Sequence, residues 1–307
     1  MDVERTGGLN RALPLPFRLA RTGLNGLGRI SPPLAGRLAF HFFCTPFRYP
    51  EPPRETQVLR QAERFSIPFR DVQLAAYAWG QGPTVLLVHG WSGRGSQLGA
   101  FVEPLVATGH RVVAFDLPAH GRTPGRRTNA LVAAEAVLRA GEAMGPLRGV
   151  IAHSFGALCT TLALRDGLDA GGAVYVAPAS RASQAVRGFS RQLGLSWPVE
   201  WGLRGEMERR FGPGVWPRFS ARACAPSLGV PVLVFHDLDD AEVPYREGQL
   251  LAHSWPGARL VTLAGLGHRR ILRDERVIGR AVDFLRAARI PSASSVSSVS
   301  SASASVA

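Results

Sequence analysis

A single serine stands between a short apolar run and a helical pattern near the middle of the chain. Residues 149–153 read Gly-Val-Ile-Ala-His, Ser154 follows, and residues 155–164 carry apolar side chains at helical spacing. Where a strand turns directly into a helix, the two backbones nearly touch, so small residues are needed two positions before and after the serine. Ala152 and Gly156 meet this need. The stretch predicts a sharp strand–turn–helix unit that presents Ser154, although similar strings also occur in ordinary turns.

Strand and helix patterns alternate on both sides of this unit. Strands are expected over residues 64–69, 72–79, 84–89, 111–116, 149–153, 172–176, 230–236 and 259–263. Helices are expected over residues 96–108, 129–144 and 270–288. After an antiparallel first pair, such alternation builds a mostly parallel twisted sheet with helices on both faces. The predicted fold class is therefore α/β.

The alternation spans residues 59–290 and is interrupted once. Residues from about 178 to 229 lie between two expected strands and contain three tryptophans and several arginines. We expect this segment to form a small helical cap inserted into the domain. The uncharged Ser/Ala/Val tail, residues 291–307, cannot bury enough apolar surface to fold and is predicted to be disordered.

Residues 1–58 form a basic extension with only four acidic residues. Gly23, Gly26 and Gly28 are expected to interrupt any long amphipathic helix there. Arginines beside aromatic residues would permit a weak peripheral contact between this arm and an anionic membrane. We favour the simpler interpretation, in which the apolar face of the extension packs on the main domain.

Composition narrows the possible partners. The chain is 46% hydrophobic and 19% charged, and no apolar run reaches the roughly 18–20 residues of a membrane span. All 36 basic residues are arginine and the net charge is +13. The use of arginine at every basic position indicates codon bias rather than a functional arginine patch. Without a recognition motif, the charge does not predict a nucleic-acid partner.

Three cysteines, Cys44, Cys159 and Cys224, are too few and too far apart for a disulfide framework or a metal site. No cluster of other side chains has metal-ligand spacing, so neither a metal nor a cofactor is expected. The N-terminus lacks the continuous apolar core of a secretory signal, so a cytoplasmic location is the default expectation. The alternative is a cytoplasmic protein in peripheral contact with a membrane. The sequence leaves the oligomeric state open.

A serine hydroxyl becomes a nucleophile at neutral pH only beside a histidine base, which in turn needs a carboxylate to fix its tautomer. Downstream of Ser154, the strand at 230–236 ends in acids and is followed by a Val-Pro pair. The strand at 259–263 is followed by a glycine-flanked histidine, His268. Candidate acids are Asp237, Asp239, Asp240 and Glu242.

With these residues in this order, the chain resembles the Ser-His-Asp members of the α/β-hydrolase superfamily over about residues 66–288. The resemblance implies that Ser154 is the nucleophile and His268 the base. It selects Asp240 as the acid, three residues before the Val-Pro pair, while the other three acids remain alternatives. Ala152 departs from the usual G-x-S-x-G pattern. A serine at this position argues against the dehalogenases and epoxide hydrolases, which use aspartate.

The resemblance also implies an oxyanion hole built from the backbone N–H groups of Trp91 and Phe155. His89 and the turn at residues 116–122 are assigned to the structure of the loops around it rather than to catalysis. The expected function is cleavage of a carboxylic ester or thioester of a small-molecule acyl substrate, through an acyl-enzyme on Ser154.

Two other functions stay open. An acyltransferase or a C–C bond hydrolase would use the same triad, and a non-catalytic, membrane-associated binding protein would keep only the fold. If the triad is catalytic, we expect His268 Nε2 within roughly 2.6–3.2 Å of Ser154 Oγ, or somewhat farther without a ligand.

Overall fold

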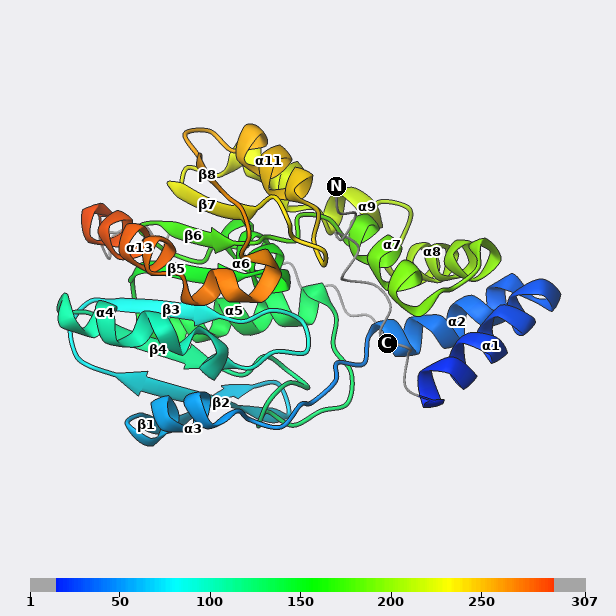
Figure 1. Ribbon diagram of the computed structural model, residues 1–307, viewed down its shortest axis with the longest axis horizontal. Helices are drawn as coiled ribbons and strands as arrows, with labels where there is room; N and C mark the ends of the chain where they lie inside the picture. Colours follow the sequence, from blue (N-terminus) through cyan, green and yellow to red (C-terminus); the bar gives the residue numbers. More distant parts are fainter. Residues whose placement is uncertain (1–14, 290–307) are drawn as a thin grey trace, which may run out of the picture.

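The computed structural model describes residues 15–289, and within them an eight-stranded sheet forms the centre (Figure 1). Its strands are β1 (Glu63–Phe69), β2 (Val72–Trp79), β3 (Thr84–Val88), β4 (Arg111–Phe115), β5 (Leu147–His153), β6 (Ala173–Val176), β7 (Val232–Asp237) and β8 (Arg259–Leu263). The strand order is β1-β2-β4-β3-β5-β6-β7-β8. β2 pairs antiparallel with β1 and with β4, and all other neighbours are parallel. The predicted α/β fold class is confirmed.

Helices cover both faces because successive strand residues point to opposite sides. On β3, Leu86 and Val88 join the core under α5 (Ala130–Met144), α6 (Phe155–Arg165) and α11 (Tyr245–Ser254). Val85 and Leu87 join the core on the other face. That face is covered by the 3-10 helix η1 (Gly95–Phe101), α4 (Val102–Ala107), the 3-10 helix η3 (Ile271–Arg273) and α13 (Glu275–Ala287).

Two of the expected helices are divided. The helix predicted over residues 96–108 consists of η1 followed by α4. The one predicted over 270–288 consists of α12 (Gly267–Arg270), η3 and α13. Asp274 separates the last two because its carboxylate accepts hydrogen bonds from the N–H groups of Arg276 and Val277, which caps α13.

Between β6 and β7 the chain leaves the sheet as a helical insertion. It contains α7 (Ala182–Leu193), α8 (Trp197–Phe211), α9 (Val215–Arg218), α10 (Ala221–Cys224) and the 3-10 helix η2 (Ala225–Ser227). β6 runs parallel to β5, and Ser154 follows the end of β5. The insertion therefore begins at the same edge of the sheet as Ser154.

In the described part of the N-terminal extension, the first two elements are antiparallel helices, α1 (Leu15–Ile30) and α2 (Pro32–Phe43) (Figure 1). The prediction that glycines interrupt α1 is wrong, because the helix runs through all three of them. Gly28 is needed for packing: a Cβ there would come within 2.6 Å of Val199 Cγ2 on α8. Gly36 on α2 likewise lies directly against the backbone of Gly202 on α8, where a Cβ would collide with it. This hairpin therefore packs on the insertion and not on the sheet (Figure 1).

Residues 46–60 pack on the part of the domain that contains the sheet. α3 (Pro53–Arg60) lies over η1, with Val58 against Gly99. Buried Glu55 accepts a 2.8 Å hydrogen bond from Ser96 Oγ. No helix between residues 15 and 289 has the length and hydropathy of a membrane span. The tail predicted to be disordered lies outside the described residues.

Candidate active site

Ser154 occupies a backbone conformation that few residues other than glycine adopt. Its φ is 52° and its ψ is −116°, at the junction of β5 and α6. Such a conformation costs about 1–3 kcal/mol and persists only where the surroundings hold it. Ser154 N donates to Val176 O at 3.0 Å, and Ser154 O accepts from Ala157 N and Ala179 N. These three bonds fix the turn at the sheet edge.

Small residues allow this turn to approach β3. A Cβ on Gly156 would lie 2.6 Å from the carbonyl oxygens of both Val88 and His89. A Cβ on Gly90 would lie 3.1 Å from Ser154 Cβ. Ala152, the departure from the family pattern, is fully buried within β5 and fits there as alanine.

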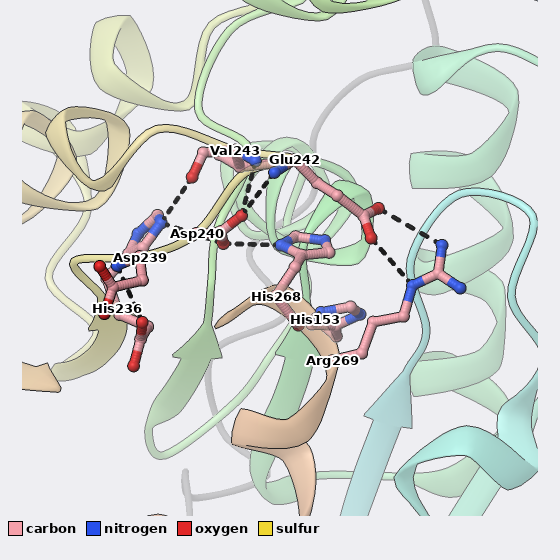
Figure 2. A network of polar contacts seen from close by, with 9 residues as sticks. His153, His236, Asp239, Asp240, Glu242, Val243, His268 and Arg269 are labelled. Atoms are coloured by element: carbon pink, nitrogen blue, oxygen red, sulfur yellow. Dashed lines mark hydrogen bonds and ion pairs between the residues drawn. The ribbon is translucent and has the colours of Figure 1, made fainter. Parts of the chain in front are cut away.

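Asp240 and His268 form the central contact of the site (Figure 2). His268 Nδ1 donates to Asp240 Oδ2 at 2.7 Å, and both residues are buried. The other oxygen of Asp240 accepts from the N–H groups of Glu242 and Val243 at 2.9 and 2.8 Å. Burial alone would raise the pKa of Asp240, but hydrogen bonds from His236 and His268 outweigh it and hold that pKa below its ordinary value. The carboxylate is therefore ionised at neutral pH.

The competing acids bind the backbone of the loop that carries His268. Asp237 Oδ2 accepts from Leu266 N at 3.0 Å, and Asp239 Oδ2 accepts from Gly265 N at 2.9 Å. Glu242 forms an exposed ion pair with Arg269 at 2.9 Å. All three tie the acid loop to the histidine loop, whereas Asp240 contacts the imidazole itself.

His153 supports His268 from the other side (Figure 2). Its Nε2 donates to His268 O at 3.0 Å, and the two rings lie 4.6 Å apart between centroids. Burial lowers the pKa of His153 well below its ordinary value, so the ring is neutral. The carbonyl bond places its proton on Nε2. His153 therefore packs against the ring of His268 and also anchors the loop that carries it.

Ser154 and His268 are not hydrogen-bonded to each other. Among residues 15–289, Ser154 Oγ has no hydrogen-bond partner, so the expected bond to His268 Nε2 is not formed. Hydrogen bonds of this kind are often long in the absence of substrate. The two residues are nonetheless close in the structure, because His153, the residue before Ser154, contacts His268 directly.

The loop after β3 lies against the turn that carries Ser154. The rings of Trp91 and Phe155 meet edge to face, with centroids 5.1 Å apart. In the described part of the chain, no hydrogen bond is donated by the backbone N–H of either residue. Two backbone donors thus remain available beside Ser154.

His89 orders this loop, as predicted. Burial lowers the pKa of His89 to about 4, so its ring is neutral. Its Nδ1 donates to Gly90 O at 2.7 Å, and its Nε2 accepts from Leu117 N at 3.0 Å. Asp116, in the turn assigned to structure, accepts from Gly95 N and Arg122 N, both at 2.8 Å. These bonds hold the loop after β3 to the loop after β4.

His236 is a site residue that the sequence interpretation missed. It lies at the end of β7, where its Nε2 donates to Val243 O at 3.0 Å and lies 3.4 Å from Asp240 Oδ2. Asp240 therefore contacts two histidines. The i,i+4 spacing of His236 and Asp240 was visible in the sequence, but their contact depends on how the chain turns after the strand.

Comparison with protein-family models matches residues 85–280 to the α/β-hydrolase family. The chain belongs to this family. The match includes Ser154, Asp240 and His268, and it confirms the resemblance inferred from those residues.

Individual proteins agree with this assignment. The hydrolase is 28% identical over 244 residues to the pimeloyl-[acyl-carrier protein] methyl ester esterase of Chromobacterium violaceum, covering 68% of this chain and 93% of the relative. Its fold is similar to that of a Pyrococcus furiosus esterase, with a TM-score of 0.60 and 19% identity over 80% of this chain and 98% of the other. A thermophilic esterase from Thermogutta terrifontis gives a TM-score of 0.54 and 21% identity, covering 73% of this chain and 98% of the other.

Proposed function

We propose that this hydrolase cleaves a carboxylic ester or thioester through an acyl-enzyme on Ser154. The chain is a hydrolase that acts on ester bonds, as its family and its relatives indicate. The observation that carries the finer proposal is the 2.7 Å bond from His268 Nδ1 to Asp240. It keeps a proton on Nδ1, so Nε2 is free to accept one.

In the proposed reaction, Ser154 Oγ attacks the acyl carbonyl carbon while His268 Nε2 takes the hydroxyl proton. The bond from the carbonyl carbon to the leaving oxygen or sulfur then breaks, and Nε2 returns the proton to the leaving group. Water attacks the acyl-enzyme in the second half, and Nε2 takes its proton and passes it to Ser154 Oγ. The acid is released, and the N–H groups of Trp91 and Phe155 bind the oxyanion in both halves.

Asp240 stabilises His268 while it carries the extra proton. The carboxylate is ionised and its second oxygen is held by two backbone N–H groups. A charge fixed in this way needs no rearrangement when the imidazolium forms. His236 Nε2 donates to Val243 O and lies 3.4 Å from Asp240 Oδ2, so the ring packs against the same carboxylate and limits its rotation.

Acyl transfer and C–C bond hydrolysis remain alternatives with the same residues. We favour ester hydrolysis because the relatives are named esterases. A non-catalytic binding protein would not need the strained backbone of Ser154. The Chromobacterium violaceum relative is named for a methyl ester on a carrier-bound acyl chain, so methyl esters of acyl chains are the first substrates to test.

The test is a graded set of chromogenic acyl esters and thioesters, with methyl esters beside them. We expect Ser154→Ala to lower kcat by a factor on the order of 10⁶ on whichever ester turns over best. Ser254→Ala, on α11 and bonded to Leu250 O, is the matched control and should keep wild-type turnover. Equal turnover by wild type and Ser154→Ala would refute the nucleophile assignment.

A further inference from the structure

The N-terminal hairpin of α1 and α2 turns one face to α8 and the opposite face to solvent. On α1, Gly28 contacts α8, and Leu19 lies nine residues away, about 180° around the helix. Ile30, two residues beyond Gly28, also points away from α8. On α2, Gly36 contacts α8, and Leu34 and Leu38 each lie two residues from it, about 200° around.

The outward face of the hairpin is apolar. It carries exposed Leu19 (65%), Ile30 (85%), Leu34 (47%), Leu38 (42%) and Phe42 (46%). The three α2 residues stand four apart and therefore form one row along the helix. Single exposed apolar residues are ordinary on a protein surface, but five of them on two adjacent helices form a patch that marks an interaction site.

The charged residues of the hairpin itself have one sign. Residues 15–43 contain four arginines and no aspartate or glutamate. Arg18 and Arg29 are both exposed and stand eleven residues apart on α1, which places them about 20° apart around the helix, beside the row of Leu19 and Ile30. Exposed apolar residues flanked by arginines are the combination that inserts into the interface of a membrane with anionic headgroups.

We propose that the outward face of the α1–α2 hairpin docks on an anionic lipid surface. A second copy of this chain fits less well, because a symmetric contact between two hairpins would bring their arginines together, and neither hairpin carries an acid to pair with them. The bilayer supplies both parts of the match, anionic headgroups for Arg18 and Arg29 and an apolar layer for the leucines. Since the docking face is opposite the face that packs on α8, the hairpin would lie between the bound membrane and the insertion (Figure 1).

The test is co-sedimentation of the full chain with phosphatidylcholine vesicles that either contain or lack phosphatidylglycerol. We expect binding to the anionic vesicles, weaker binding as salt rises, and little binding to the neutral ones. Arg18→Gln with Arg29→Gln should weaken binding about 25-fold, at about fivefold per arginine. Leu34→Ser with Leu38→Ser should weaken it about tenfold for each leucine.

The overall charge of +13 could by itself attract anionic vesicles, so a charge-matched control is needed. Arg273→Gln with Arg280→Gln removes two exposed arginines, one from η3 and one from α13, and α13 lies at the opposite end of the molecule from the hairpin (Figure 1). This pair should leave binding within about twofold of wild type. Equal losses from the two arginine pairs would overturn the proposal, because binding would then follow net charge alone.

Two further outcomes would also overturn it. One is an absence of binding to anionic vesicles. The other is a dimer in sedimentation velocity that dissociates when Leu34 and Leu38 become serine, which would identify a second copy as the occupant. Hydrolysis of a short soluble ester, measured on the same variants, should stay unchanged, so a failure of the docking proposal is separate from a failure of the proposed chemistry.

Discussion

Replacing Asp240 by asparagine tests which acid serves the base. The carboxylate lies 2.7 Å from His268 Nδ1, and its side chain is fully buried. At that distance and an effective dielectric constant of about 20, its attraction for the imidazolium is about 6 kcal/mol. Loss of this stabilisation corresponds to roughly four decades in kcat/KM. An asparagine amide can also turn its NH₂ group toward Nδ1, which favours the tautomer with its proton on Nε2. That tautomer cannot accept the serine proton, so this effect also lowers kcat/KM.

The assay is kcat/KM on the best chromogenic ester for wild type, Asp240→Asn and Asp239→Asn. Asp239→Asn is the matched control: it removes the same charge one residue away, and its side-chain oxygen can still accept from Gly265 N. We expect Asp239→Asn to stay within about tenfold of wild type, since it loses only the charge assistance of one hydrogen bond. If Asp239→Asn lost as much activity as Asp240→Asn, the acid assignment would be refuted.

Two other substitutions and one pH titration have defined outcomes. Gly156→Ala should lower the free energy of unfolding by about 1–3 kcal/mol in urea titrations, because its Cβ would lie 2.6 Å from two carbonyl oxygens, whereas Gly279→Ala, with open space around it, should not. His153→Phe keeps a ring but loses the bond to His268 O, so kcat should fall about fivefold with KM unchanged; a rise in KM alone would contradict a positioning role. Folding lowers the pKa of Asp240, so this carboxylate contributes fully to the free energy of unfolding when the pH is above its ordinary pKa of 3.8. That contribution disappears as the pH falls below 3.8. Asp240→Asn should therefore flatten the loss of stability with falling pH in this range, and an unchanged slope would count against the lowered pKa.

The sheet and the turn at Ser154 were predictable because their causes are local. The strands alternate or bury apolar residues over short runs, and the small residues around Ser154 signal the tight turn. The cap on α13 was also local: Asp274 stands directly before the helix, and its capping signal could have been read from the sequence.

What the sequence did not predict depends on contacts between distant segments. α1 continues through three glycines, and α8, more than 150 residues later, packs closely on one of them, Gly28. Helix propensity alone predicted an interruption, and tertiary packing overrode it. His153 and His236 gained their contacts with His268 and Asp240 in the same way, through loops whose paths no local pattern specifies.

The most direct test of the central proposal is to trap the acyl-enzyme. Mixing the hydrolase with an activated chromogenic ester and quenching in acid within the first turnover should give a chain heavier by one acyl group. Peptide mapping should place that group on Ser154, with no adduct on Ser154→Ala. An adduct on another residue, or rapid turnover by Ser154→Ala, would contradict the account.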